Sequence, residues 1–279
     1  MGLGCNSHVV RRWERIARQW WLYALLVLIQ FLPPYISRGF DWSVLSWKTY
    51  VPFIVSSYSY ILTHAIIRAF PAPVIPVIQS LALLMVSVVF LWGNRGRRLF
   101  ALYVAASYFM FAVLQTVSVT SEHGVAIILV YFGMFVVVAG FWLWEALTPS
   151  NDFTPQTRSL QRYWVLPLAL LAFWNPISPT TFGPEWRWQY VFTSGSSLTF
   201  CMMTAVYLAV LVLFYPTVNR VIMGVTGLMG LIIGLLNLLG NFVLAPNMWW
   251  NGVLHLPLVI LSLHALRLSR QTPESPTMS

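Results

Sequence analysis

The chain has 279 residues, of which 58% are hydrophobic and 8% are charged. A soluble domain carries roughly 25% charged residues, so this composition excludes an ordinary soluble protein. The net charge of +9 comes from basic residues at the ends of apolar runs, which favours an anionic membrane surface, and not nucleic acid, as their partner. The main partner predicted for the chain is therefore the lipid bilayer.

The N-terminal segment, residues 1–19, is predicted to form a basic amphipathic helix. Its apolar side chains recur at helical spacing, namely Val9, Trp13, Ile16 and, just beyond, Trp20. Its basic side chains fall on the opposite face, namely Arg11, Arg12, Arg15 and Arg18. Such a helix lies in the headgroup plane of an anionic leaflet. The alternative is that this segment extends the first span.

Runs of about 20 apolar residues predict membrane-crossing helices. In chain order the runs are 20–36, 51–69, 74–92, 99–118, 125–147, 163–178, 197–215, 220–240 and 248–267. They predict an all-α fold, a polytopic transmembrane helix bundle over residues 20–268 with eight or nine spans. Tryptophans gather at the run ends, as in an aromatic belt. The polar tail, residues 269–279, is predicted to be disordered.

The arginines predict the orientation of the bundle. Short loops that carry Arg stay in the cytoplasm. The arginines of the Gly93–Arg98 turn, of 148–162, at Arg220 and after 248–267 fall on one side if each intervening run crosses once. The C-terminus is therefore expected in the cytoplasm, with the plasma membrane as the membrane in question. The loops 120–124, 183–194 and 241–247 are expected outside.

The run 51–69 leaves the N-terminal topology open. It contains Ser56, Ser57, His64 and Arg68, with Pro52 near its start, and is the weakest of the runs. If it crosses, there are nine spans and the N-terminus lies outside. If it does not cross, there are eight, and a partly inserted segment must have its backbone satisfied by protein or water.

Two stretches of the chain resemble one another. Tyr50-Val51 and Phe70-Pro71 are echoed by Tyr190-Val191 and Tyr215-Pro216, and Gly93-Asn94 is echoed by Gly240-Asn241. A true repeat would give a 4+1+4 arrangement with the run 125–147 as connector, and a shift of five spans would make the two units inverted, as in many transporters. The alternative is chance similarity between loops rich in Trp and Pro.

Residues that carry chemistry are few. No span holds a carboxylate near its centre, which argues against a carboxylate-driven proton pump and against Asp-dependent intramembrane enzymes. Ser194–Ser197 lacks the Gly-x-Ser-Gly elbow of a serine hydrolase, and Cys5 and Cys201 form no metal motif. His255 and His264 fall on different helix faces, which disfavours haem. No catalytic residue, metal site or cofactor is predicted.

Four glycines in the run 220–240 are predicted to share one helix face. They are Gly224, Gly227, Gly230 and Gly234. Glycine lets two helix backbones approach closely, so this face predicts a packing seam. The functional alternative is a helix that slides or pivots on its partner. Asn237 and Asn241 extend the same face outward.

The best candidate site gathers polar residues that are expected in the outer half of the bundle. They are His64, Arg68, Glu122, His123, Asn237, Asn241, Asn251 and His255. Asn251 and His255 are four residues apart and stack on adjacent turns, and Pro257 frees the carbonyl of Val253. This group predicts a ligand-binding site. The alternative for Asn251 and His255 is an inter-helix hydrogen bond that fixes packing.

Three classes of function follow from these patterns. The first is a transporter-like carrier or binding protein for a small polar or amphiphilic molecule. The second is a non-catalytic accessory, anchoring or sensory subunit that binds another membrane protein or a second copy of itself. The third is a membrane enzyme or haem protein, which needs a catalytic group or cofactor that the sequence does not reveal.

Overall fold

The computed structural model describes residues 28–38, 46–154 and 160–271. The described chain is mostly helical, which confirms the all-α class. The predicted interfacial helix at 1–19 and residues 272–279 of the predicted tail lie outside the described residues. Helix α11 continues to Arg270, into the first residues of the predicted tail.

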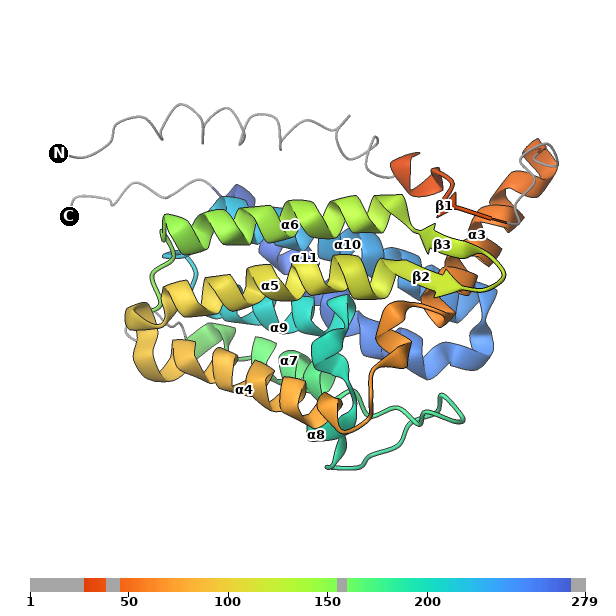
Figure 1. Ribbon diagram of the computed structural model, residues 1–279. Coiled ribbons are helices and arrows are strands. Elements are labelled where there is room, and N and C mark those ends of the chain that lie inside the picture. Colours follow the sequence, from red (N-terminus) through yellow and green to blue (C-terminus); the bar gives the residue numbers. More distant parts are fainter. Residues whose placement is uncertain (1–27, 39–45, 155–159, 272–279) are drawn as a thin grey trace.

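Nine α-helices organise the described residues (Figure 1). They are α3 (Trp47–Thr63), α4 (Val74–Trp92), α5 (Arg97–Thr116), α6 (Leu129–Leu147), α7 (Val165–Trp174), α8 (Tyr190–Thr193), α9 (Phe200–Leu213), α10 (Arg220–Leu239) and α11 (Trp249–Arg270). Short 3-10 helices join them: η1 (Ile29–Phe31), η3 (Ile66–Ala69), η4 (Gly93–Arg95), η6 (Leu160–Arg162), η7 (Ser196–Leu198) and η9 (Pro246–Met248). One π-helix, η8 (Gly240–Leu244), continues α10.

Five helical segments in the described part of the chain are long and apolar enough to cross a membrane. They are Val74–Arg95, Arg97–Thr116, Leu129–Leu147, Arg220–Leu244 and Pro246–Arg270. Tyr190–Leu198 and Phe200–Leu213 make a sixth candidate if the two pieces count as one span, although they meet at an angle of 96°. The chain is therefore a membrane protein. The run 163–178 forms a helix of only 10 residues, α7.

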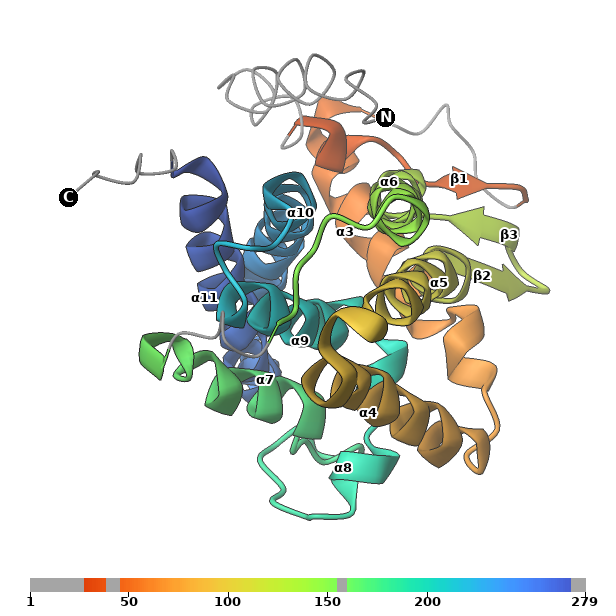
Figure 2. The same ribbon diagram turned by 90° about the vertical axis from the view of Figure 1, so that its left-hand side faces the viewer.

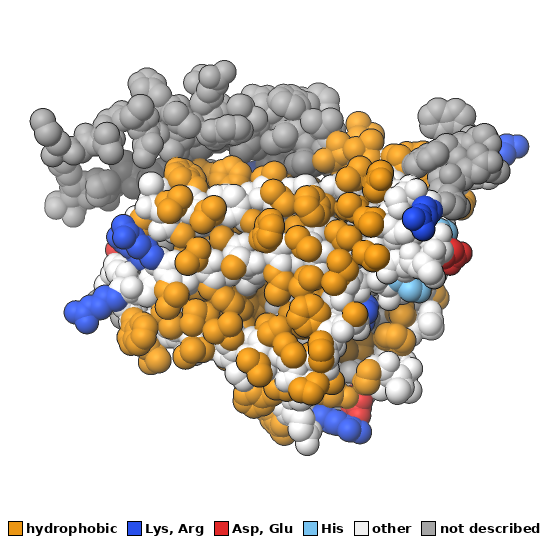
Figure 3. Space-filling view, in the orientation of Figure 1, with side chains coloured by type: hydrophobic (Ala, Val, Ile, Leu, Met, Phe, Trp, Pro, Cys, Tyr) orange, Lys and Arg blue, Asp and Glu red, His pale blue; other side chains and the backbone are white. Residues whose placement is uncertain are grey.

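The surface between the two ends of the bundle is apolar. Figure 3 shows hydrophobic side chains covering this flank, with Lys and Arg at the ends. Exposed side chains on α4, α5 and α6 contribute, among them Leu84, Phe109 and Val137. An exposed apolar belt between charged ends is the surface that a bilayer requires.

The two ends differ in charge. One end, here called the basic end, holds Arg95, Arg97, Arg98, Arg162, Arg220, Arg267 and Arg270, at the termini of α4, α5, α7, α10 and α11. The opposite end, here called the hairpin end, holds strands β2 and β3 and the turn from α10 to α11 (Figure 1). Successive long helices therefore run antiparallel, as the short connections predict.

A small sheet was not predicted. Strands β1 (Tyr35–Ile36), β2 (Val117–Thr120) and β3 (Gly124–Ile127) pair antiparallel in the order β1-β3-β2. The predicted spans 20–36, 99–118 and 125–147 are therefore wrong at these strands. β-Branched residues such as Val117, Val119 and Thr120 favour extended chain. Gly124, with φ of +63°, makes the turn that a side chain would resist.

Helix α3 lies across the hairpin end. Seen along the bundle, α5 and α6 appear end-on while α3 appears lengthwise (Figure 2). Ser46 and Thr49 form a capping box at its start, and Tyr60 near its end donates a hydrogen bond to Thr120 of β2. The run 51–69 is therefore anchored to the sheet, and its axis crosses those of its neighbours.

Helix α9 forms the centre of the bundle. Each of its residues except Cys201 is buried, and it packs against α5, α7, α10 and α11. A helix that is apolar on all sides is buried on all sides. Its Tyr207 contacts the rings of Phe100, Tyr108 and Trp142. The core of the protein therefore surrounds one short helix of 14 residues.

The glycine face of α10 lies against α11. A Cβ atom added to Gly227 would lie 3.2 Å from the carbonyl oxygen of Ser262, and one added to Gly234 would lie 2.7 Å from Cγ2 of Val259. A Cβ on Gly230 would clash with Oγ of Ser262. Gly224 likewise faces Ser269. All four glycines therefore mark a close helix–helix contact.

Candidate functional site

The helical conformation is interrupted immediately before α9. Two helical pieces, Tyr190–Leu198 and Phe200–Leu213, meet at 96°, and Gly195 adopts a left-handed conformation with φ of +70°. Thr199 between them is extended. Irregular backbone at membrane depth is tolerated only where protein or water satisfies its polar groups, so the partners of this segment identify the site.

Gln79 of α4 supplies most of those partners. Its side chain is fully buried. The two hydrogens of Nε2 are shared among three acceptors, the carbonyl of Phe173 at 3.3 Å, Ser194 Oγ at 3.3 Å and Ser196 Oγ at 2.6 Å. The Oε1 atom accepts from the backbone N–H of Ser197 at 3.0 Å. One amide thus joins the end of α7 to the segment in front of α9.

A second amide caps α9 itself. Gln115 of α5 accepts, through Oε1, the backbone N–H of Phe200 at 2.9 Å. The next residue, Cys201, receives a contact of 3.8 Å from Asn237 Nδ2 of α10, which also donates to the carbonyl of Ile233 at 2.9 Å. Polar side chains from α4, α5 and α10 therefore converge on the start of α9.

The predicted residues of α10 and α11 continue from Asn237 as a chain of hydrogen bonds. Asn241 donates to the carbonyl of Asn237 at 2.7 Å, and Asn251 donates to Asn241 Oδ1 at 3.0 Å. His255 Nδ1 lies 2.7 Å from the carbonyl oxygen of Asn251. Asn241 belongs to the π-helix, a form that occurs frequently at functional sites.

The hydrogen bond of His255 determines its tautomer. A carbonyl oxygen only accepts, so Nδ1 of a neutral imidazole must carry the proton. Nε2 is then left with a lone pair that can accept a hydrogen bond. His255 is 5% exposed, and Pro257 has no N–H for the carbonyl of Val253. The buried end of this series of hydrogen bonds therefore presents two acceptors, Nε2 of His255 and the carbonyl oxygen of Val253.

Two further buried atoms near the break lack a partner within the described chain. They are Ser197 Oγ and Asn175 Oδ1. The side chain of Ser197 is fully buried, and the backbone N–H of the same residue donates to Gln79. Asn175 ends α7 in a left-handed conformation, two residues after Phe173. A buried polar atom without a hydrogen bond is costly, so these atoms are suited to an outside donor.

We name these groups the break site: Gln79, Asn175, Ser197, Asn237 and His255. Asn241 and Asn251 link Asn237 to His255. The remaining four predicted site residues, His64, Arg68, Glu122 and His123, lie elsewhere, around Tyr60 at the sheet. Its ring stacks on His64 at 4.2 Å and meets His123 edge-on at 4.7 Å.

These four residues form a separate group at the hairpin end. His123 Nε2 lies 3.9 Å from Glu122 Oε1, and Arg68 sits in η3 beside this group. No hydrogen bond or ion pair among the described residues joins it to the break site. Figure 2 shows the hairpin and α11 on different sides of the bundle. The predicted cluster is therefore two groups.

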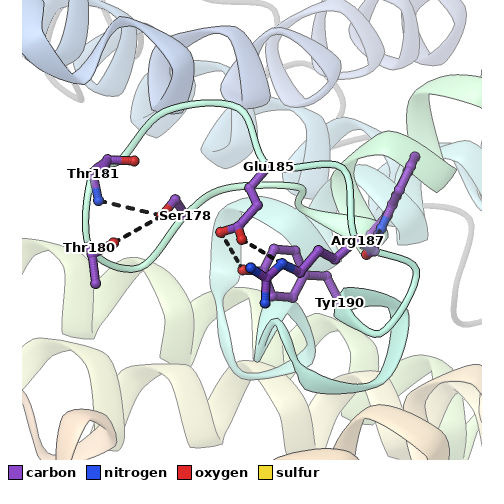
Figure 4. A network of polar contacts seen from close by, with 7 residues as sticks. Ser178, Thr180, Thr181, Glu185, Arg187 and Tyr190 are labelled. Atoms are coloured by element: carbon purple, nitrogen blue, oxygen red, sulfur yellow. Dashed lines mark hydrogen bonds and ion pairs between the residues drawn. The ribbon is translucent and has the colours of Figure 1, made fainter.

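The loop between α7 and α8 forms its own polar network (Figure 4). Glu185 forms an ion pair with Arg187 and accepts a hydrogen bond from Tyr190 at 2.7 Å. That hydrogen bond holds the pKa of Glu185 below its usual range. Trp174 stacks on Trp188 at 4.7 Å. These contacts fold the loop back on the end of α7, so its carboxylate has a structural role.

Sequence reasoning did not find Gln79 and Gln115. An amide in an apolar run is costly to bury without partners, although less so than a charged group. Each is a lone amide inside a predicted span, and that pattern could have marked it. Ser194–Ser197, which lacks a hydrolase motif, supplies backbone and side-chain partners to Gln79. Within the described residues, no three His, Cys, Asp or Glu side chains are grouped to hold a metal ion.

In comparisons with known proteins, no family model, no curated protein and no solved structure matches the chain.

Proposed function

We propose that this membrane protein is a carrier or binding protein for a small polar or amphiphilic molecule, which binds at the break site. The observation that carries the proposal is the broken chain before α9, with amides from α4, α5 and α10 gathered on it. Transporters often place their substrates at discontinuous helices near the middle of the membrane. An interrupted helix in an otherwise apolar bundle has a cost that a binding role explains.

The chemistry of the site favours a ligand with N–H or O–H groups. Ser197 Oγ, Asn175 Oδ1 and the Nε2 atom of His255 can each accept a hydrogen bond. None of the five residues of the break site is a carboxylate or a guanidinium, so the site carries no fixed charge. We infer a neutral donor, such as an alcohol, an amide or the polar end of an amphiphile.

The test is retention of a small molecule by the purified full-length protein. Extraction and mass spectrometry should find a compound bound to the wild type and absent from His255→Ala. His264→Ala is the matched control, because it changes the same residue type on the same helix at the basic end, where His264 packs on Trp164.

Arg68→Gln distinguishes the two groups of predicted residues. If the ligand binds at the break site, Arg68→Gln and His264→Ala both retain it. A wild type that retains nothing, or a His255→Ala variant that retains as much as the wild type, contradicts the proposal. Loss in Arg68→Gln alone would move the ligand to the group around Tyr60.

For the topology we propose eight spans, with both termini in the cytoplasm of a plasma-membrane protein. The arginines at the basic end and the crosswise position of α3 support this arrangement. In a chain without its native cysteines, Ser56→Cys in the middle of α3 should react with an impermeant maleimide from outside. Protection of that cysteine would favour nine spans. The 4+1+4 inverted repeat stays a prediction.

A second candidate is a non-catalytic accessory subunit that binds another membrane protein or a second copy of this chain. It is favoured by the Gln79 amide, whose donor and acceptor atoms are both occupied within the protein. In that case the interruption before α9 serves to pack α4, α7 and α9 together. A wild type that retains no small molecule but purifies with a partner would support it.

A further inference from the structure

Two arginines flank one tyrosine at the basic end. The Cζ atom of Arg162 lies 5.0 Å from the ring centroid of Tyr215, and that of Arg220 lies 5.5 Å from it. Arg162 ends η6 in front of α7, and Arg220 begins α10. Cation–π contacts of this kind hold guanidinium groups in fixed positions. Two positive charges are therefore held around the turn from α9 to α10.

Backbone carbonyls hold the same two side chains. Arg162 Nη1 donates to the carbonyl of Tyr215, and Arg220 Nη1 donates to the carbonyl of Gln271. A guanidinium has five N–H donors, so each arginine keeps further donors for another partner. Arg267 is a third cation at this end, because it lies on the last turn of α11, just before the Gln271 carbonyl that accepts from Arg220.

These three cations form no ion pair in the part of the chain that the structure describes. The carboxylates of the same end are engaged elsewhere. Glu145 accepts hydrogen bonds from the backbones of Ser150 and Asn151 and from the side chain of Asn219.

Asp152 is engaged in the same way. It accepts hydrogen bonds from Asn94 Nδ2 at 2.7 Å and from the backbone N–H of Thr154 at 2.8 Å. Neither carboxylate forms an ion pair with Arg162, Arg220 or Arg267 among the described residues.

Exposed apolar side chains follow the cations along α7 and α11. Leu166 and Leu170 of α7 are 37% and 53% exposed, and Leu263 of α11 is 41% exposed. Helices α7 and α11 are neighbours in the bundle. A charged group at the membrane boundary above an exposed apolar flank matches the shape of a phospholipid, with its phosphate at the arginines and its acyl chains along the leucines.

We propose that Arg162, Arg220 and Arg267 bind the phosphate of an anionic phospholipid whose acyl chains lie against α7 and α11. Guanidinium groups bind phosphate oxygens through paired, charge-assisted hydrogen bonds. A lipid with net negative charge supplies a counter-charge, whereas phosphatidylcholine carries its own cation. The lipid is distinct from the ligand of the break site, because the arginines surround the turn after the last residue of α9, whereas the break site lies at its first residue.

The test is native mass spectrometry of the full-length protein in detergent with phosphatidylglycerol or with phosphatidylcholine of the same chains. The wild type should bind one phosphatidylglycerol in preference. Arg162→Gln and Arg220→Gln should each weaken that binding at least about tenfold, as expected for loss of charge-assisted hydrogen bonds. Arg98→Gln, an exposed arginine of the same end, is the matched control and should change it less than about twofold.

Three results would overturn the proposal. They are equal binding of phosphatidylcholine, equal weakening by Arg98→Gln, and full displacement of the lipid by inorganic phosphate, which would indicate a site for a free anion. If Arg162→Gln or Arg220→Gln fails to fold, Arg267→Gln decides the question, because Arg267 is exposed on the last turn of α11. Unchanged lipid binding in folded Arg267→Gln would then contradict the proposal.

Discussion

Gln79 and Ser197 lie 118 residues apart in the sequence, and the Gln79 side chain accepts the backbone N–H of Ser197 at 3.0 Å. This hydrogen bond fixes the broken chain before α9 to α4. The same side chain donates to the carbonyl of Phe173, so α4, α7 and α9 depend on one amide.

Gln79→Leu should destabilise the protein by about 1–3 kcal/mol for each buried group that it leaves without a partner. The N–H of Ser197 is the group concerned, because the carbonyl of Phe173 also accepts a hydrogen bond from Ser196 Oγ. Thermal unfolding in detergent, followed by tryptophan fluorescence, measures the change. Gln189→Leu makes the same replacement at an exposed amide and should leave the midpoint unchanged. Equal effects of the two variants would refute the role of Gln79.

Gly230→Ala should lower stability by about 1–3 kcal/mol, because the added methyl group meets Ser262, Leu258 and Thr204. Gly140→Ala is the matched control, since nothing lies within 4 Å of a Cβ placed there. It should be neutral or slightly stabilising. The comparison is made on unfolding midpoints in the same detergent. An unchanged midpoint in Gly230→Ala would contradict the claim that close contact between α10 and α11 at this residue stabilises the protein.

Asp152 should give the protein a dependence on acid pH. Hydrogen bonds from Thr154 and then Asn94 lower the pKa of its carboxyl group. A pKa that is lower in the folded state adds stability above the pKa of the unfolded chain, and this stability is lost as pH falls through the folded value. The loss is expected below about pH 4.

Unfolding midpoints between pH 3 and pH 6 would test this expectation for Asp152. Asp152→Asn should show a flatter dependence than the wild type over that window. Glu122→Gln, at an exposed carboxyl of the hairpin turn, should keep the wild-type slope. Parallel curves for Asp152→Asn and the wild type would rule out this contribution.

Glu145→Ala should be among the most destabilising single changes at the basic end. Glu145 is 2% exposed and accepts bonds from Ser150, Asn151 and Asn219. Hydrogen bonds to a charged group contribute about 1.5–3 kcal/mol each. A double-mutant cycle with Asn219→Ala isolates the pair, and a coupling energy near zero would contradict the direct contact.

The sequence predicted the membrane class and most helices because the length of an apolar run is a strong constraint. The runs 74–92 and 220–240 coincide closely with α4 and α10. The sequence did not predict the structure where backbone polar groups bond to side chains that are distant in the sequence. The bend before α9 depends on Gln79 and Gln115, and no local pattern predicts a bond across 118 residues.

Part of the geometry of the candidate residues follows from the sequence. Spacing along one helix correctly related Asn251 to His255, and their hydrogen bond follows from that spacing. The packing of different elements could not be deduced in this way. His64 and His123 share Tyr60, a residue that spacing did not select, because strand pairing brings the hairpin turn to the end of α3.

The enclosure of α9 sets an order of assembly during synthesis. Two of its neighbours, α10 and α11, follow it in the chain. When α9 leaves the ribosome, the surfaces that will cover it do not yet exist, and one side of the helix must face lipid or a chaperone. Nascent chains that stop before Arg220 should therefore be recognised as incomplete by membrane quality control, although every earlier helix has been made.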